Sequence, residues 1–149
     1  MSLPLVTALA QCERHAAIMS DALRQIPDPL TEADMKQSSP ELIRLLDQFV
    51  LRYTKLQDTL GTHVLRQFAA GVLAEPVEDV AFIDVLNLLE RRGYLTADQW
   101  ALQRTTRNIL THEYPDDPVR QALALTAALA AARQLMDWLR KIGERAAKA

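Results

Sequence analysis

A short polar stretch near residue 110 combines side chains that can bind phosphate and move protons. The stretch is RNILTHEYP, residues 107–115, and it contains Arg107, Asn108, His112 and Tyr114. Histidine can accept or donate a proton near neutral pH, because its reference pKa is about 6.5. Arginine offers a planar fork of donors that matches phosphate oxygens, and asparagine can hold a substrate or orient the histidine. These residue types suit cleavage of an RNA strand, where the 2′-hydroxyl is the nucleophile and the protein supplies a base, an acid and cationic donors.

The same residues have a second interpretation as the polar end of a helix. Side chains of these types often bond to the free carbonyls of a last turn or offset the helix dipole. In a regular helix over 97–114, Arg104, Asn108 and His112 recur every four residues and form one polar row. Arg107 and His112 diverge by about 140° in such a helix. They can therefore meet only through the long arginine side chain, at an irregular helix end, or across a dimer.

The elements that position this stretch are all predicted to be helices. The chain has only four glycines and no runs of alternating β-branched residues, so the predicted fold class is all-α. Pro27 and Pro29 end a first helix, a serine before Pro40 caps a second, and Gly93 ends a third. We expect one domain over residues 1–149, a compact antiparallel bundle of about five helices. These helices span residues 3–26, 40–73 with a loosening at Gly61, 79–92, a stretch from 97 to before Pro115, and 118 onward, with one further turn at 31–36.

Composition and charge exclude several classes of function. Seventeen Lys and Arg against nineteen Asp and Glu give a formal charge of -2, so any contact with nucleic acid needs a local basic cleft. Cys12 is the only cysteine, which excludes an internal disulfide and fits a cytoplasmic protein. No apolar stretch approaches the roughly 18 residues of a membrane helix. The three histidines lie on different predicted helices without ligand spacing, and there is no phosphate-binding glycine loop, so we expect no metal and no cofactor.

The polar stretch resembles a known family motif. Arg107, His112 and Tyr114 are spaced as in the R-x4-H-x-Y motif of the HEPN superfamily, in particular of its HepT toxins, and Asn108 gives the common R-N-x3-H form. The flanking segments LERRGYLTADQWALQRTTRN (89–108) and RYTKLQDTLG (52–61) are also similar to elements of HepT-like proteins. The resemblance extends over roughly residues 45–115, in the family's order.

The resemblance implies a helical bundle that forms a homodimer, in which the two motif helices line a shared cleft. It implies a metal-independent endoribonuclease with Arg107 and His112 as the catalytic pair and Asn108 as a supporting residue. Arg104, in the same polar row, is expected to be a further supporting residue. Tyr114 would be the residue to which a partner minimal nucleotidyltransferase, the antitoxin, attaches AMP. A phosphate-bearing adduct at that position would repel an RNA phosphate.

Two other functions remain open from the sequence. One is a non-catalytic helical adaptor that binds a nucleotidyltransferase. The other is a plain dimerising bundle, in which Arg107 and His112 would be tied up in caps within the chain. Acidic side chains at Glu113, Asp116 and Asp117 oppose RNA binding unless they point away, and the available compensation comes from four arginines at positions 91, 92, 104 and 120.

Overall fold

Helices make up every regular element in the described part of the chain. The computed structural model describes residues 3–112 and 114–149, and the all-α prediction is confirmed for them. The elements are α1 (Leu5–Gln25), α2 (Glu32–Lys36), α3 (Pro40–Thr59), the π-helix η1 (Leu60–Val64), α4 (Leu65–Gln67), the π-helix η2 (Phe68–Val72), α5 (Phe82–Arg91), α6 (Ala97–Leu110) and α7 (Pro118–Ala147).

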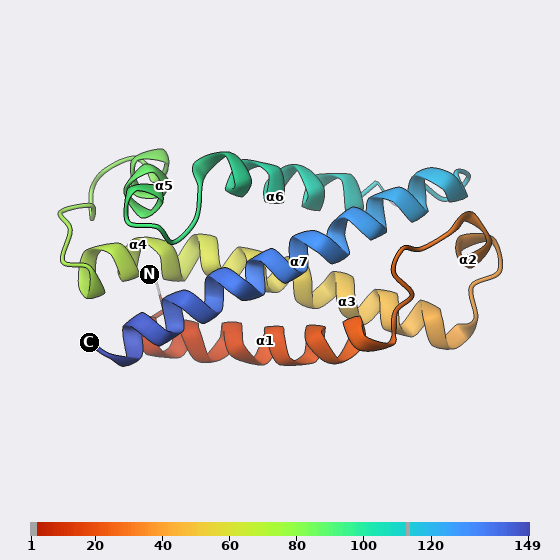
Figure 1. Cartoon of the computed structure of the whole chain (residues 1–149), viewed down its shortest axis with the longest axis horizontal. Coiled ribbons are helices and arrows are strands. Elements are labelled where there is room, and N and C mark those ends of the chain that lie inside the picture. Colours follow the sequence, from red (N-terminus) through yellow and green to blue (C-terminus); the bar gives the residue numbers. More distant parts are fainter. Residues whose placement is uncertain (1–2, 113) are drawn as a thin grey trace.

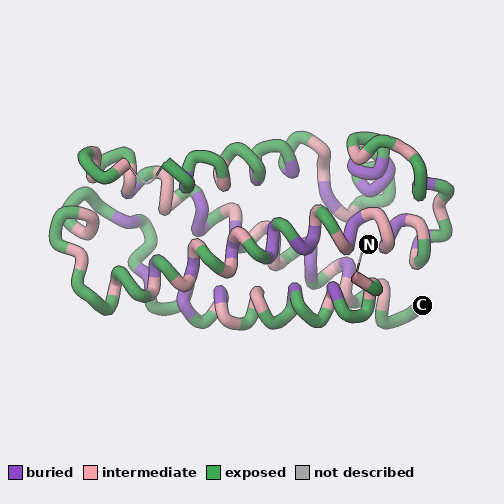
Figure 2. The backbone as a smooth tube through the Cα atoms, turned by 180° about the vertical axis from the view of Figure 1, so that it is seen from behind, coloured by how far each residue is buried: buried purple, intermediate pink, exposed green. Residues whose placement is uncertain are grey.

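Three long helices lie side by side, with a fourth crossing them. In Figure 1, α3 runs between α6 and α1, while α7 crosses the bundle diagonally on one side, and both chain ends lie at the same end of the molecule. The helix α1 packs along α3, and α6 and α2 pack against α7. Viewed from behind, the tube shows exposed positions alternating with buried ones along each helix, as expected when one face of each helix turns toward a shared core (Figure 2).

Most of the predicted helix ends are confirmed by their caps. Ser39 accepts the backbone N–H of Leu42 at the start of α3, with Pro40 as the first helical residue. The predicted turn at 31–36 forms as α2, with a reciprocal capping box between Thr31 and Asp34. Gly93 follows α5 with φ of 82°, in the left-handed region that glycine tolerates.

The start of α5 differs from the sequence prediction. The third predicted helix begins at Phe82 and not at residue 79, because Arg66 Nη1 donates to the carbonyls of Val77 and Val80, both at 2.7 Å, and so holds this segment outside a helix. The fourth predicted helix ends at Leu110, before Pro115 as expected, and Tyr114 beyond it has a φ of 45°.

The helix predicted over 40–73 continues past Gly61 through two π-helical segments. A Cβ built on Gly61 would lie 2.9 Å from Cζ2 of Trp100, so the indole packs directly against this glycine. Trp100 is itself fixed between Phe82 and Trp138, with ring centroids 6.1 Å away on each side. The loosening predicted at Gly61 is therefore a widened turn that receives Trp100 of α6.

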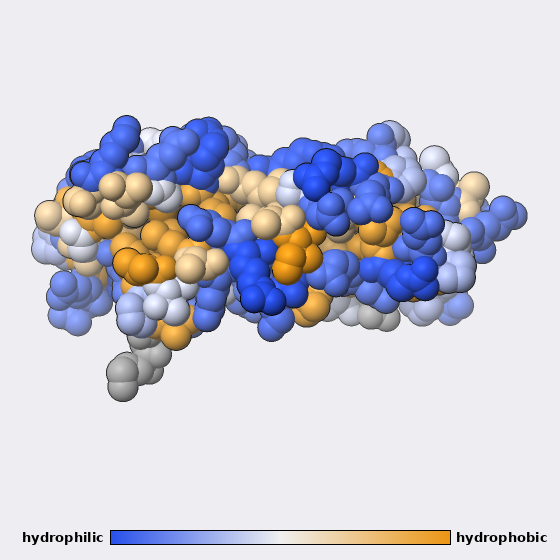
Figure 3. Space-filling view, turned by 90° about the horizontal axis from the view of Figure 1, so that it is seen from below, coloured by the Kyte–Doolittle hydropathy of each residue, from blue (hydrophilic) through white to orange (hydrophobic). Residues whose placement is uncertain are grey.

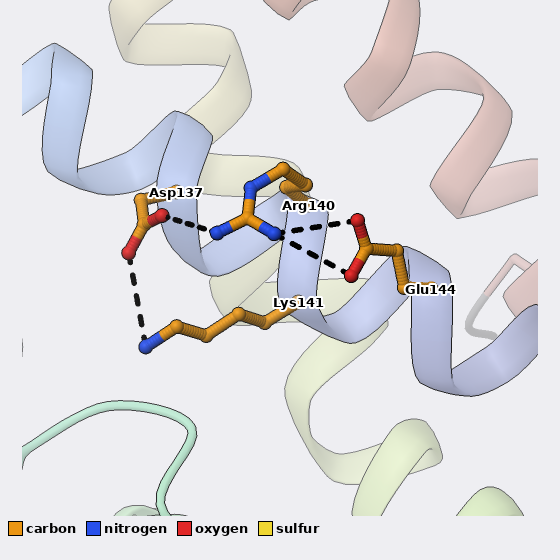
Figure 4. Close-up of polar contacts among 4 residues, drawn as sticks. All are labelled: Asp137, Arg140, Lys141 and Glu144. Atoms are coloured by element: carbon orange, nitrogen blue, oxygen red, sulfur yellow. Dashed lines mark hydrogen bonds and ion pairs between the residues drawn. The ribbon is translucent and has the colours of Figure 1, made fainter.

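Surface side chains are mostly charged or polar. Figure 3 shows a face on which hydrophilic residues divide the apolar surface into separate areas, with a broad one toward the end that holds the termini. Along the exposed side of α7, opposite charges alternate at helical spacing: Arg140 bonds to Asp137 at 2.8 Å and to Glu144 at 3.3 Å, and Lys141 lies 3.7 Å from Asp137 (Figure 4). None of the described helices combines the length and apolarity that crossing a membrane would require.

The contact between Gly61 and Trp100 gives a matched pair of substitutions. We expect Gly61→Ala to lower the free energy of unfolding by about 1–3 kcal/mol, since the new methyl group overpacks a buried indole. Gly71→Ala should be neutral or stabilise by up to about 1 kcal/mol, because a Cβ there meets no atom within 4 Å. Urea denaturation measures both, and a Gly61→Ala variant as stable as Gly71→Ala would contradict this packing.

Candidate functional site

Arg107 lies in the last turn of α6 and is paired with a carboxylate of α3. Its guanidinium donates to both oxygens of Asp58, with Nη2 3.2 Å from Oδ2 and a closer contact between Nη1 and Oδ1. The two side chains are 32% and 51% exposed, so water screens the pair. The pair turns Arg107 toward α3, and no hydrogen bond joins it to His112 in the described part of the chain. Arg107 is thus held by an ion pair between helices and not by a cap at its own helix end.

A buried hydrogen-bond network lies beneath this ion pair. The Tyr53 hydroxyl on α3 donates to Oε1 of Gln103 on α6 at 2.7 Å. The Gln103 amide in turn donates to the Ala131 carbonyl at 2.8 Å and to Oε1 of Gln134 at 2.9 Å, both on α7. Burial raises the pKa of Tyr53, while the charge of Arg107 acts in the opposite direction, so the phenol keeps its proton and remains a donor. The network ties three helices together one turn before Arg107.

Neither Tyr53 nor Gln103 was identified as a site residue from the sequence. Gln103 is 1% exposed and occupies the face of α6 that also buries Trp100 and Leu110. A glutamine at an apolar position of a helix is a usable signal, because a buried amide requires hydrogen-bond partners.

His112 and Tyr114 lie in the turn that follows α6. His112 is exposed, and its backbone N–H donates to the Ile109 carbonyl at 3.2 Å. The Tyr114 ring is half-buried, with its centroid 5.9 Å from that of His112, and the guanidinium of Arg120 lies 5.3 Å over the Tyr114 ring. Glu113, one of the acidic residues expected to oppose RNA binding, lies outside the described residues. The turn thus brings a histidine, a tyrosine and an arginine together.

The predicted polar row along α6 is interrupted by the end of the helix. Arg104 and Asn108 are exposed on α6 as predicted. The row stops there because the Asn108 carbonyl accepts both the N–H of Thr111 at 3.3 Å and its hydroxyl at 2.7 Å, which tightens the last turn. His112 therefore leaves the helical row and lies beside Tyr114 instead.

A groove of about 710 Å³ opens beside the motif, between α2, α3, α6 and α7. Its wall is mainly aliphatic and includes Leu46, Val50 and Leu125, and Tyr114 and Ile109 are also among the lining residues. This groove was not predicted from the sequence, because it is assembled from four separate helices. Tyr114 of the motif therefore forms part of a concave apolar surface, a setting typical of binding sites.

No family model, no curated protein and no solved structure matches this chain.

Among the described residues, no group of three His, Cys, Asp or Glu side chains is arranged to hold a metal ion. Cys12 is buried in α1, and burial, with a smaller effect from Glu13, raises the pKa of its thiol to about 12, so it is an unreactive thiol at neutral pH.

Two contacts join α6 to α3, the Tyr53–Gln103 hydrogen bond and the Asp58–Arg107 ion pair. They should contribute differently to the free energy of unfolding. We expect Tyr53→Phe to cost about 1–3 kcal/mol of unfolding free energy, because it leaves the buried Gln103 oxygen without a donor. Asp58→Asn should cost less than about 1 kcal/mol, because its ion pair with Arg107 is exposed to water. Urea denaturation of both variants tests this order, which would be wrong if Asp58→Asn were the more destabilising change.

Proposed function

We propose that this chain is a HepT-like toxin, a metal-independent endoribonuclease that acts as a homodimer and is neutralised by a minimal nucleotidyltransferase antitoxin. The observation that carries the proposal is the motif at the end of α6, where Arg107, His112 and Tyr114 have the family's spacing. Their surroundings support it: all three side chains reach the surface to some extent, the rings of His112 and Tyr114 lie 5.9 Å apart, and Tyr114 lines a groove.

The proposed reaction uses the RNA's own nucleophile. His112 takes the proton of the 2′-hydroxyl, the 2′-oxygen forms a bond to phosphorus, and the bond to the 5′-oxygen breaks. The leaving oxygen takes a proton from an acid supplied by the second copy in the dimer, which leaves a 2′,3′-cyclic phosphate and a 5′-hydroxyl. Arg107 exchanges Asp58 for the phosphate and stabilises the charge that develops on its oxygens.

Modification of Tyr114 would silence the enzyme through charge. In the proposed step the Tyr114 hydroxyl oxygen attacks the α-phosphorus of ATP bound to the antitoxin, the phenolic proton is lost, and pyrophosphate leaves. The resulting phosphodiester carries a negative charge beside His112 and under Arg120. That charge pairs with the cationic side chains that the RNA phosphate needs, and it repels the RNA backbone.

A second function is favoured by two observations. In this chain the guanidinium of Arg107 is already neutralised by Asp58, and the apolar groove beside Tyr114 offers a surface to a protein partner. A non-catalytic adaptor that binds a nucleotidyltransferase would have both features. The two functions differ in whether His112 is needed for any activity.

RNA cleavage tests the catalytic pair directly. Purified protein should cleave RNA between pH 6 and 8 in the presence of EDTA, and His112→Ala should lower the rate by about 10²–10⁴-fold, as is usual for loss of a general acid or base. Arg107→Gln should show a comparable loss, whereas Lys148→Gln, which removes an exposed cation after α7, should leave cleavage at the wild-type rate. Intact RNA with the wild-type protein at every pH would count against the ribonuclease and favour the adaptor.

A substitution at Tyr114 distinguishes neutralisation by the antitoxin from RNA cleavage. We expect Tyr114→Phe to retain RNA cleavage but to resist neutralisation by the antitoxin with ATP, since the phenylalanine has no hydroxyl to accept AMP. Mass spectrometry of the wild-type chain after incubation should show added AMP, and the Tyr114→Phe chain should show none. AMP on a different residue, with the Tyr114→Phe chain still silenced, would remove this role from Tyr114.

A further inference from the structure

A second group of cationic side chains lies apart from the motif, at the contact between α1 and α3. Arg52 on α3 faces His15 on α1, with Nη1 3.0 Å from Nδ1. Because arginine can only donate, His15 accepts through Nδ1 and is the neutral tautomer with its proton on Nε2. Burial, followed by the charges of Arg52, Lys55 and Arg14, lowers the pKa of His15. We refer to these four residues as the basic cluster.

The cations of the basic cluster have no carboxylate partner among the residues that the structure describes. None of the ion pairs there includes Arg14, Arg52 or Lys55. The adjacent carboxylate Glu13 is directed toward α7, where its Oε1 lies 3.9 Å from the position of a Cβ on Gly143. The Nε atom of Arg52 is buried and has no hydrogen-bond partner. Like charges are therefore gathered here and left uncompensated.

The exposed side of α7 shows a different arrangement. There Arg140 and Lys141 have carboxylates three or four residues away, and these pairs are closed at 2.8–3.7 Å (Figure 4). The chain as a whole carries a charge of -2, so the basic cluster has the opposite sign to the net charge. A cluster of one sign on a protein of the other sign raises the local concentration of anions and provides a site for them.

The position of the basic cluster connects it to the candidate site. The helices α1, α3 and α6 lie side by side with α3 in the middle (Figure 2). Lys55 precedes Asp58 by three residues, so the two lie on the same side of α3, and Asp58 bonds to Arg107 of α6. Cationic side chains thus lie on α1, on α3 and at the motif, with Asp58 between Lys55 and Arg107.

We propose that the basic cluster is a second phosphate-binding site, which holds the backbone of a single-stranded RNA whose reacting phosphate lies at Arg107. The inference rests on the proposed function for the choice of RNA over other polyanions. A strand fits better than a free phosphate, because the cations come from two helices and continue toward the motif, as successive phosphates would require. Contacts of this kind position a strand without reading its sequence.

Binding of a strand that cannot be cleaved tests the inference without any need for catalysis. A 2′-O-methyl oligonucleotide has no free nucleophile, so its affinity can be measured over a series of salt concentrations. For the double variant Arg14→Gln/Lys55→Gln, we expect the slope of log K against log salt to fall by about 0.7 for each phosphate that the variant no longer neutralises. At about 0.1 M salt this corresponds to roughly fivefold weaker binding for each such phosphate.

A matched control carries the same change in net charge at other places. In Lys36→Gln/Lys148→Gln the substituted residues lie at the end of α2 and after α7, and this variant should keep the wild-type slope and affinity. Arg14 and Lys55 are exposed, so the test variant should melt no lower than the wild type, since it loses only unopposed like charges. Arg52→Gln, which removes the half-buried cation, should weaken binding in the same direction.

Three results would overturn the inference. The first is a wild-type chain that does not bind the oligonucleotide, or a test variant that binds with unchanged affinity and slope. The second is displacement of the oligonucleotide by inorganic phosphate at equal phosphate concentration, which would indicate a site for a free anion. The third is polyglutamate that binds the cluster as tightly as the oligonucleotide, which would indicate an acidic protein partner. A chain that binds as expected but cleaves no RNA would contradict only the proposed ribonuclease.

Discussion

The buried amide of Gln103 is the constraint on which the arrangement of the bundle depends. At 1% exposure it cannot be solvated, so its oxygen must find a donor and its nitrogen must find acceptors. It does so with Tyr53 of α3 on one side and with Ala131 and Gln134 of α7 on the other. These bonds are directional, whereas apolar packing is not, and they fix the rotation of α6 about its own axis. With α6 fixed in this way, Arg107 faces α3 one turn later, while Asn108 remains on the surface.

The end of α6 decides how the motif is presented. The Thr111 hydroxyl and N–H close on the Asn108 carbonyl, and Tyr114 adopts a left-handed conformation that is costly for a bulky residue. Such a conformation persists only where its surroundings hold it, and at Tyr114 these are the packing against Arg120 and the wall of the groove. The result is a tyrosine at a concave surface beside an exposed histidine, an arrangement that a continued helix would not produce.

Charge on the face formed by α1, α3 and α6 is organised around one carboxylate. Asp58 neutralises Arg107, and the basic cluster on α1 and α3 takes part in none of the ion pairs of the described residues. Since the Asp58 pair is exposed, we infer that a polyanion bound along the basic cluster would compete with this carboxylate for Arg107. Under the proposed function, the same exchange couples binding of the RNA strand to release of the catalytic arginine.

Local sequence signals were sufficient to predict most of the helix ends in this fold. Ser39 with Pro40, Thr31 with Asp34, and Gly93 set helix ends through bonds and backbone conformations that involve only neighbouring residues, so these ends were predicted correctly. The late start of α5 was missed because it depends on Arg66, which reaches across from another helix to occupy carbonyls that a helix would use. For the candidate site, the sequence identified the residue types and their spacing at Arg107, His112 and Tyr114. Only the tertiary structure decided that Arg107 pairs with Asp58, that a groove opens beside Tyr114, and that Arg52 meets His15, because each of these contacts joins helices that are distant in the chain.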